Sequence, residues 1–271
     1  MNKLTKRVIT AISIILFVGF GLFLLPRWFY ALVVILLIAG GLNEFYGLIE
    51  KKGIFIYKYF GVFIGVLIPL SIYFRFEPTK GWEMFFIAAS TLIFFVLQFI
   101  RKDSSQAIVG ISTTMFGIFY ISWFFSFLIK IRFLPYGTYF AAFLLLVTKM
   151  GDVGAYVIGK SIGKHTLIPR ISPKKTLEGS LGGLGFSLAA ALLSKLYLPF
   201  IPVIHLIAMG IIIGFVAQLG DLCESLIKRD CQVKDSGANI PGLGGILDVI
   251  DSIIFATPIF YCYLFYFKLI P

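Results

Sequence analysis

Long apolar runs separated by short polar turns dominate this sequence. A helix that crosses the hydrocarbon core of a membrane needs about 20 apolar residues, and about nine runs have a suitable length. Their expected bounds are Val8–Leu25, Trp28–Ile49, Ile54–Phe74, Trp82–Ile100, Ala107–Ile129, Tyr136–Ile158, Gly179–Leu198, Ile201–Leu219 and Ile250–Leu269. The pattern therefore predicts an all-α, polytopic membrane protein.

Two long polar stretches interrupt the second half of the chain. The basic segment covers residues 159–178, and the acidic segment covers residues 221–251. Two expected spans lie between them, so both segments should face the same side of the membrane and be able to meet. We therefore divide the chain into an N-terminal set of about five spans, residues 1–135, and a catalytic membrane region, residues 136–271.

Lysine and arginine gather in alternate loops, which predicts the orientation. The richest groups lie at 51–52, 101–102, 160–175 and 228–234. Loops on the cytoplasmic side carry an excess of these residues. The N-terminus and both polar segments are therefore expected in the cytoplasm, with the protein in the cell (inner) membrane.

Composition supports a membrane location and bears on possible partners. The chain is 59% hydrophobic and 14% charged, whereas about 25% of a soluble domain is charged. The net charge of +11 is spread over short loops. Such a distribution indicates orientation and contact with anionic lipid, so no nucleic-acid partner is expected.

The acidic segment combines carboxylates with glycine-rich turns. Asp221 lies where one span is expected to end, and Asp248 and Asp251 lie where the last span begins. Mg²⁺ prefers a few carboxylates together with water and phosphate oxygens, so these three residues are the expected metal ligands. In the competing interpretation the loop is solvated, and its acids pair with lysine and arginine at 228, 229 and 234.

Charged residues also interrupt an apolar run near the inner end of a span. Lys149 and Asp152 are three residues apart, and charges at membrane depth usually line a cavity or a site. A simple neutralising pair explains the pattern equally well. Asn43 and Glu44 form a second polar patch, expected either to line the same cavity or to cap a helix end.

The basic segment favours phosphate binding. Lys174 and Lys175 precede Glu178, where a span is expected to begin with a helix N-terminus. Basic side chains beside a helix N-terminus suit anionic oxygens. The alternative ligand is the head group of an anionic lipid.

Two stretches resemble the CDP-diacylglycerol synthase (phosphatidate cytidylyltransferase) family. They are DVGAYVIGKSIGKHTLIPRISPKKTLEGS, from Asp152, and SLIKRDCQVKDSGANIPGLGGILDVID, from Ser225. Both stand in the family's order and spacing, whereas the N-terminal half matches only as a set of spans. Three positions depart: Val153 replaces the usual Ser or Thr, Leu243 the usual His and Val249 the usual Arg.

The resemblance implies that phosphatidate and CTP give CDP-diacylglycerol and pyrophosphate, in a Mg²⁺-dependent reaction that uses one cation or two. It implies a catalytic role for Asp221, Asp248, Lys228 and Arg229, with Asp221, Asp248 and Asp251 as metal ligands. The residues expected to bind substrate are Asp152, Lys174, Lys175, Glu178, Lys234, Asp235 and Asn239. A homodimer surrounded by membrane lipid is also expected.

Two other functions compete with this interpretation. A CTP-dependent lipid kinase of the polyprenol type would transfer the γ-phosphate and release CDP. A secondary transporter would use Lys149 and Asp152 as its pathway, but transporter folds often carry inverted repeats, and none is evident here. The carboxylates gathered beside glycines favour the nucleotide-using enzymes.

Overall fold

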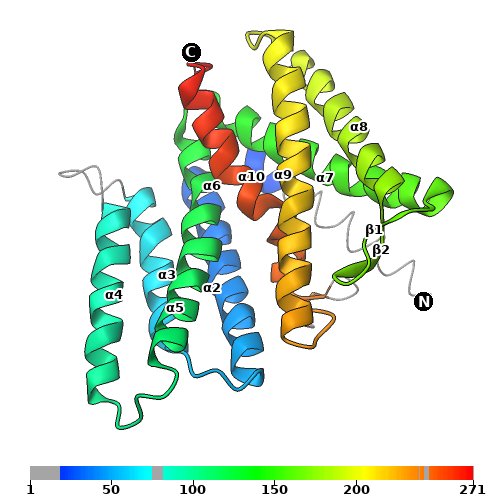
Figure 1. The fold of residues 1–271 in the computed structure, drawn as a ribbon. Coiled ribbons are helices and arrows are strands. Elements are labelled where there is room, and N and C mark those ends of the chain that lie inside the picture. Colours follow the sequence, from blue (N-terminus) through cyan, green and yellow to red (C-terminus); the bar gives the residue numbers. More distant parts are fainter. Residues whose placement is uncertain (1–18, 75–81, 238, 241–243, 271) are drawn as a thin grey trace. The chain divides into compact units, whose positions relative to one another are not determined.

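The computed structural model describes residues 19–74, 82–237, 239–240 and 244–270 (Figure 1). Helices make up most of this part of the chain. In chain order the elements are α2 (Arg27–Lys51), α3 (Lys58–Tyr73), α4 (Trp82–Ile100), α5 (Ala107–Gly117), the π-helical η1 (Ile118–Trp123), α6 (Phe124–Phe133), α7 (Gly137–Ile162), β1 (Thr166–Ile168), β2 (Ser172–Thr176), α8 (Leu177–Leu193), the 3-10 turn η2 (Ser194–Leu196), α9 (Val203–Asp230) and α10 (Leu247–Tyr266).

Seven helices in the described residues are long and apolar enough to cross a membrane. They are Arg27–Lys51, Trp82–Ile100, Ala107–Phe133, Gly137–Ile162, Leu177–Leu196, Val203–Asp230 and Leu247–Tyr266. The third runs through α5, η1 and α6 without a break. The protein is therefore a mostly helical, polytopic membrane protein, as the apolar pattern predicts.

Two of the predicted spans need separate comment. The run Val8–Leu25 lies largely outside the described residues, which begin at residue 19. The run Ile54–Phe74 contains the shorter apolar helix α3, which begins only at Lys58. The chain before α3 is not helical, and the Tyr57 backbone N–H donates to Thr114 Oγ1 at 3.1 Å.

The helices group into two compact units. The first contains the described residues up to Lys130 together with Cys231–Val249, and the second contains Ile131–Asp230 with Ile250–Pro271. The acidic segment is thus shared between the units, because residues 231–249 pack with the N-terminal helices. The predicted division at residue 135 stays a prediction.

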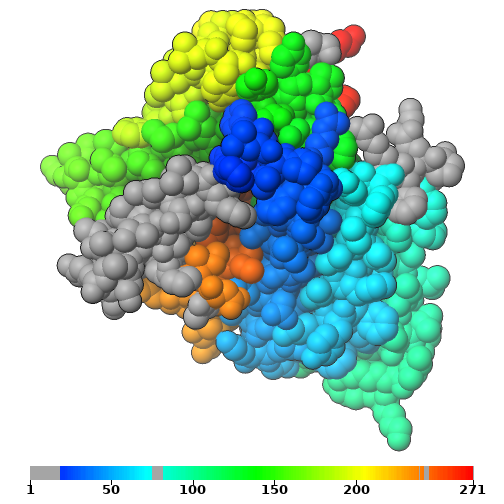
Figure 2. Space-filling model, turned by 180° about the vertical axis from the view of Figure 1, so that it is seen from behind, coloured from blue at the N-terminus to red at the C-terminus, as the bar shows by residue number. Residues whose placement is uncertain are grey.

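In the first unit, α2, α3 and α4 lie next to one another, coloured from blue through cyan in Figure 2. The buried Tyr46 of α2 donates its hydroxyl proton to the Thr114 carbonyl of α5 at 2.8 Å. Ser122 of η1 donates to the Gly65 carbonyl of α3 at 2.5 Å. These bonds satisfy polar groups inside an apolar helix bundle, where an unpaired group is costly.

In the second unit, α7 and α8 approach closely because small residues face each other. A methyl group added at Gly154 would come within 2.5 Å of the Phe186 side chain. Small residues such as Gly154 allow helix backbones to approach closely in membranes. Phe143 of α7 also stacks on Phe260 of α10, with ring centroids 5.3 Å apart.

The basic segment contains a small β-hairpin, which the all-α prediction does not include. β1 and β2 are antiparallel, with Thr166 opposite Thr176 and Ile168 opposite Ser172. Thr176 then caps α8, because its Oγ1 accepts the Gly179 N–H at 3.1 Å. Lys174 and Lys175 are adjacent in β2, and Lys174 is the more exposed of the two. The hairpin explains this difference, since successive side chains of a strand point to opposite faces.

Candidate active site

Three carboxylates meet in the second unit. Asp221 and Glu224 lie three residues apart on α9 and therefore share a face of the helix. Asp251 comes from α10. One oxygen from each lies within 4.8 Å of the others, and Glu224 and Asp251 are buried. We call these three residues the carboxylate cluster.

The composition of the carboxylate cluster suits a hard divalent cation. Like charges held this close away from water are unfavourable unless a cation or a proton offsets them. Magnesium binds oxygen ligands at about 2.1 Å in an octahedron, so two ligand oxygens on opposite sides are about 4.2 Å apart. The observed spacing of 4.8 Å or less therefore fits after a small side-chain movement. Asp221 and Asp251 are both predicted ligands, and Glu224 lies beside them.

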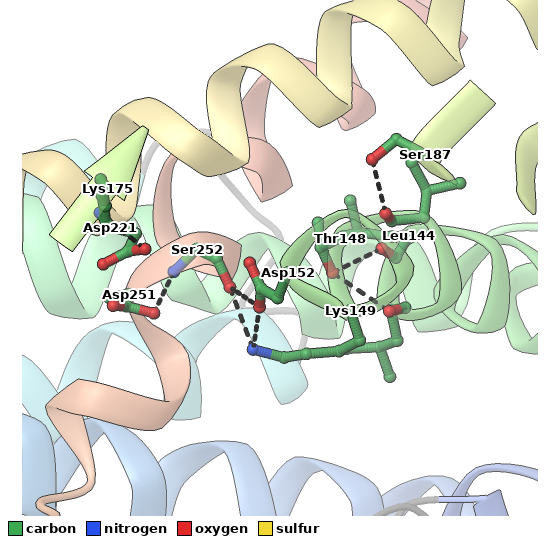
Figure 3. Close-up of polar contacts among 11 residues, drawn as sticks. Leu144, Thr148, Lys149, Asp152, Lys175, Ser187, Asp221, Asp251 and Ser252 are labelled. Carbon is green, nitrogen blue, oxygen red and sulfur yellow. Dashed lines mark hydrogen bonds and ion pairs between the residues drawn. The ribbon is translucent and has the colours of Figure 1, made fainter. Parts of the chain in front are cut away.

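Two lysines pair with the carboxylate cluster. Lys175 of β2 pairs with Asp221 (Figure 3), and its Nζ lies 2.7 Å from Asp221 Oδ2. Lys228 pairs with Glu224 one helical turn earlier on α9. The first pair joins the basic and acidic segments, which confirms the expectation that the two polar stretches meet.

A third lysine, Lys149, lies on α7 beside Asp152, an acid outside the carboxylate cluster. Lys149 Nζ is 3.1 Å from Asp152 Oδ2 and 3.0 Å from Ser252 Oγ of α10. Ser252 also donates to Asp152 Oδ2 at 3.2 Å, and its backbone N–H donates to Asp251 Oδ1 at 2.5 Å (Figure 3). The predicted Lys149–Asp152 pair is thus present, and Ser252 links it to the carboxylate cluster.

Three further candidates, two from the basic segment and one from α9, lie on or beside the hairpin. Glu178, in the first turn of α8, accepts the backbone N–H groups of Lys164 and His165 and lies 2.6 Å from His165 Nδ1. Lys174 is exposed. Arg229 of α9 donates through Nε to the Ile171 carbonyl at 3.2 Å. Glu178 and Arg229 therefore hold the basic segment in place.

Asp248 belongs to the first unit. Its Oδ2 accepts the backbone N–H of Ser236 at 2.9 Å and that of Gly245 at 2.8 Å, and it lies 2.8 Å from Ser236 Oγ. The loop between α9 and α10 therefore fixes the orientation of this carboxylate. Its role as a metal ligand stays a prediction.

The other candidates of this loop differ in their surroundings. Lys234 and Asp235 are exposed. Asn239 donates through Nδ2 to Glu44 Oε1 of α2 at 2.6 Å. Two positions that differ from the family pattern also fall near here. Leu243 lies outside the described residues, whereas Val249 lies in the first turn of α10.

Sequence reasoning gave no role to Glu224 or Ser252. The signal for Glu224 was its spacing of three residues from Asp221, which places both on one helix face. Ser252 carries no comparable signal, because its partners Lys149 and Asp152 are about 100 residues away and only the packing of α7 with α10 brings them together.

Seven membrane-length helices in the described residues, and a carboxylate cluster that pairs with lysines, define a polytopic membrane protein with an ionic site that could hold a cation. The model of the cytidylyltransferase family matches residues 5–267. The chain therefore belongs to the cytidylyltransferase family.

Curated relatives agree with this assignment. The chain is 35% identical to the phosphatidate cytidylyltransferase of Synechocystis sp. over 286 residues, covering 95% of each chain. It is 45% identical to the phosphatidate cytidylyltransferase of Bacillus subtilis over 145 residues, covering 52% of this chain and 54% of the relative. The enzyme of the same name from Staphylococcus saprophyticus is 46% identical over 124 residues, covering 45% and 48%.

Proposed function

We propose that this protein transfers CMP from CTP to phosphatidate, giving CDP-diacylglycerol and pyrophosphate. The match along 95% of a phosphatidate cytidylyltransferase carries the proposal. The carboxylate cluster, which could hold a cation, and the two lysines paired with it support the proposal. The product would enter phospholipid synthesis.

The reaction needs electrostatic assistance more than proton transfer. An oxygen of the phosphatidate phosphate attacks the α-phosphorus of CTP, and the bond from that phosphorus to the bridging oxygen of the β-phosphate breaks. The electron pair leaves with pyrophosphate. Because an ionised phosphate is already a nucleophile, no strong general base is required. The main obstacle is repulsion between anions, which fixed positive charges reduce.

Asp221, Glu224 and Asp251 would hold Mg²⁺, with Asp248 as the further ligand that the family motif implies. Bound Mg²⁺ would neutralise phosphate charge and orient the oxygens around it. The chain's own basic groups act beside it. Lys175 is 2.7 Å from Asp221 and reaches the same place from the hairpin. Lys149, Lys228 and Arg229 would hold further phosphate oxygens.

Substrate recognition would fall to residues that the family resemblance implies. Lys174 is available for the triphosphate, and Lys234, Asp235 and Asn239 for ribose or cytosine. Asp152 and Glu178 would shape the site or hold a second cation. The diacyl tails would enter sideways from the membrane, whereas CTP would enter from water.

We further propose about nine spans, with the N-terminus and both polar segments on the cytoplasmic side of the inner membrane. The excess of lysine and arginine in alternate loops supports this orientation. A homodimer is proposed from the family resemblance alone.

Purified protein in detergent, given phosphatidate and CTP labelled at the α-phosphate, tests the reaction. Label entering the lipid with equal release of pyrophosphate is the expected result, and it should require Mg²⁺. CTP labelled at the γ-phosphate distinguishes the lipid kinase, which would label the lipid and release CDP. Folded protein that gives no α-label in lipid would overturn the proposal.

A further inference from the structure

Glu44 of α2 is buried within the first unit, with 7% of its surface exposed. Its Oε1 accepts hydrogen bonds from Asn239 Nδ2 at 2.6 Å and from the Ile246 N–H at 2.9 Å. Its Oε2 accepts the Leu247 N–H at 2.9 Å and lies 3.0 Å from Ser236 Oγ. Four groups of one loop therefore converge on a single carboxylate.

Two of these donors belong to the start of α10. Leu247 is the first residue of the helix, and Ile246 precedes it. The first N–H groups of a helix have no partner within the helix, and its N-terminus carries a partial positive charge. Glu44 satisfies two of these groups from a helix about 200 residues away. It therefore caps α10 in place of a local side chain.

The same contacts connect Glu44 to Asp248. Ser236 Oγ lies between the two carboxylates, 3.0 Å from Glu44 Oε2 and 2.8 Å from Asp248 Oδ2. A serine hydroxyl donates one proton, so the two acids share a single donor. The backbone N–H groups of Ser236 and Gly245 also bind Asp248 Oδ2. Any shift of this loop would therefore turn the Asp248 side chain.

We propose that Glu44 is a positioning residue of the transfer reaction: by holding Ser236, Asn239 and the start of α10, it fixes the orientation of Asp248. This inference rests on the proposed function, in which Asp248 is an active-site carboxylate. The described hydrogen-bond partners of Glu44 all belong to the protein, so we assign it a positioning role and no direct one. Its effect is transmitted through Ser236 and the two backbone N–H groups at the start of α10.

Glu44→Gln is the first test. The amide retains one acceptor oxygen. With that oxygen in the place of Oε1, its NH₂ group faces the Leu247 N–H and the Ser236 hydroxyl, which now donate to Oε2. We expect kcat for CMP transfer to fall about 10- to 100-fold, the usual effect of removing a group that orients a ligand. The KM for CTP should change less than kcat. Glu44→Asp keeps both acceptor oxygens and should recover part of the lost kcat.

Hydrogen exchange supplies a readout that does not depend on activity. In Glu44→Gln, the amides of Ser236, Ile246 and Leu247 should exchange faster, while those of α2 remain as in the wild type. Ser236→Ala, which removes the shared hydroxyl, should lower kcat in the same direction. The double variant should lose less than the product of the two single effects, because both act through one loop.

Glu50→Gln is the matched control, since it makes the same change on the same helix at a more exposed residue paired with Lys58. It should leave kcat and exchange unchanged. Wild-type kcat in Glu44→Gln, or unchanged exchange in the loop, would overturn the inference while the wild-type enzyme remains active. If Glu44→Gln does not fold, full activity in Ser236→Ala would overturn it. Inactive wild-type protein would overturn the proposed function, and this inference with it.

Discussion

Two groups of acids in this protein are stabilised in different ways. In the second unit, Asp221 and Glu224 each pair with a lysine. In the first unit, Glu44 accepts hydrogen bonds from neutral backbone, amide and hydroxyl groups. Paired charges create a strong local field, which suits a cation and phosphates. Neutral donors with fixed directions suit positioning.

The difference also appears in where the partners come from. The carboxylate cluster receives its lysines from β2 and from its own helix α9. Glu44 instead receives donors from a single loop and from the start of α10. Substitutions should therefore affect chemistry and charge balance in the second unit, and mainly the ordering of one loop in the first.

The largest effect is expected from the predicted metal ligands. Asp221→Asn and Asp248→Asn should each lower CMP transfer by at least about 100- to 1,000-fold. Each removes a negative charge that is expected to hold the cation, and the cation neutralises the reacting phosphates. Labelled CTP measures turnover, and chromatography in detergent reports folding. Asp103→Asn, at an exposed acid paired with Arg101, is the control. Substantial activity in either variant would remove that residue from the set of metal ligands.

Next comes the buried ion pair of α9. Glu224 has no exposed surface, and the Lys228 side chain is 12% exposed. Lys228→Met leaves a buried carboxylate without this lysine, which should cost about 3–5 kcal/mol of unfolding free energy. Denaturation in detergent measures the loss. Adding Glu224→Leu should recover much of it, because an apolar pair avoids the buried charge. A double variant as unstable as Lys228→Met would show that the pair is not the cause.

A smaller effect should separate two adjacent lysines of β2. Lys175 contacts Asp221, whereas Lys174 is exposed. Lys175→Met should lower kcat about 10- to 100-fold, since it removes an interaction beside the carboxylate cluster. Lys174→Met should mainly raise the KM for CTP, as expected for a contact made equally before and during the reaction. Equal kinetic changes in both variants would contradict the alternation that the hairpin imposes.

Much of the fold can be predicted from the sequence, because membrane helices need long apolar runs. The runs beginning at Trp28, Trp82 and Ala107 correspond to described helices of spanning length. The hairpin could not be predicted this way, since its strands are short and polar. The candidate residues of the acidic segment were visible as charges in an apolar chain. Their partners were not, because Glu44 and the loop it holds are about 200 residues apart.

The most direct test of the central claim, that the carboxylate cluster holds the divalent cation, is to measure Mn²⁺ binding by electron paramagnetic resonance. The wild-type protein in detergent should bind Mn²⁺, and Mg²⁺ should compete for the same site. Asp221→Asn should bind it far more weakly, whereas Asp103→Asn should bind as the wild type does. Undiminished Mn²⁺ binding by folded Asp221→Asn would contradict the assignment of the cation to this cluster.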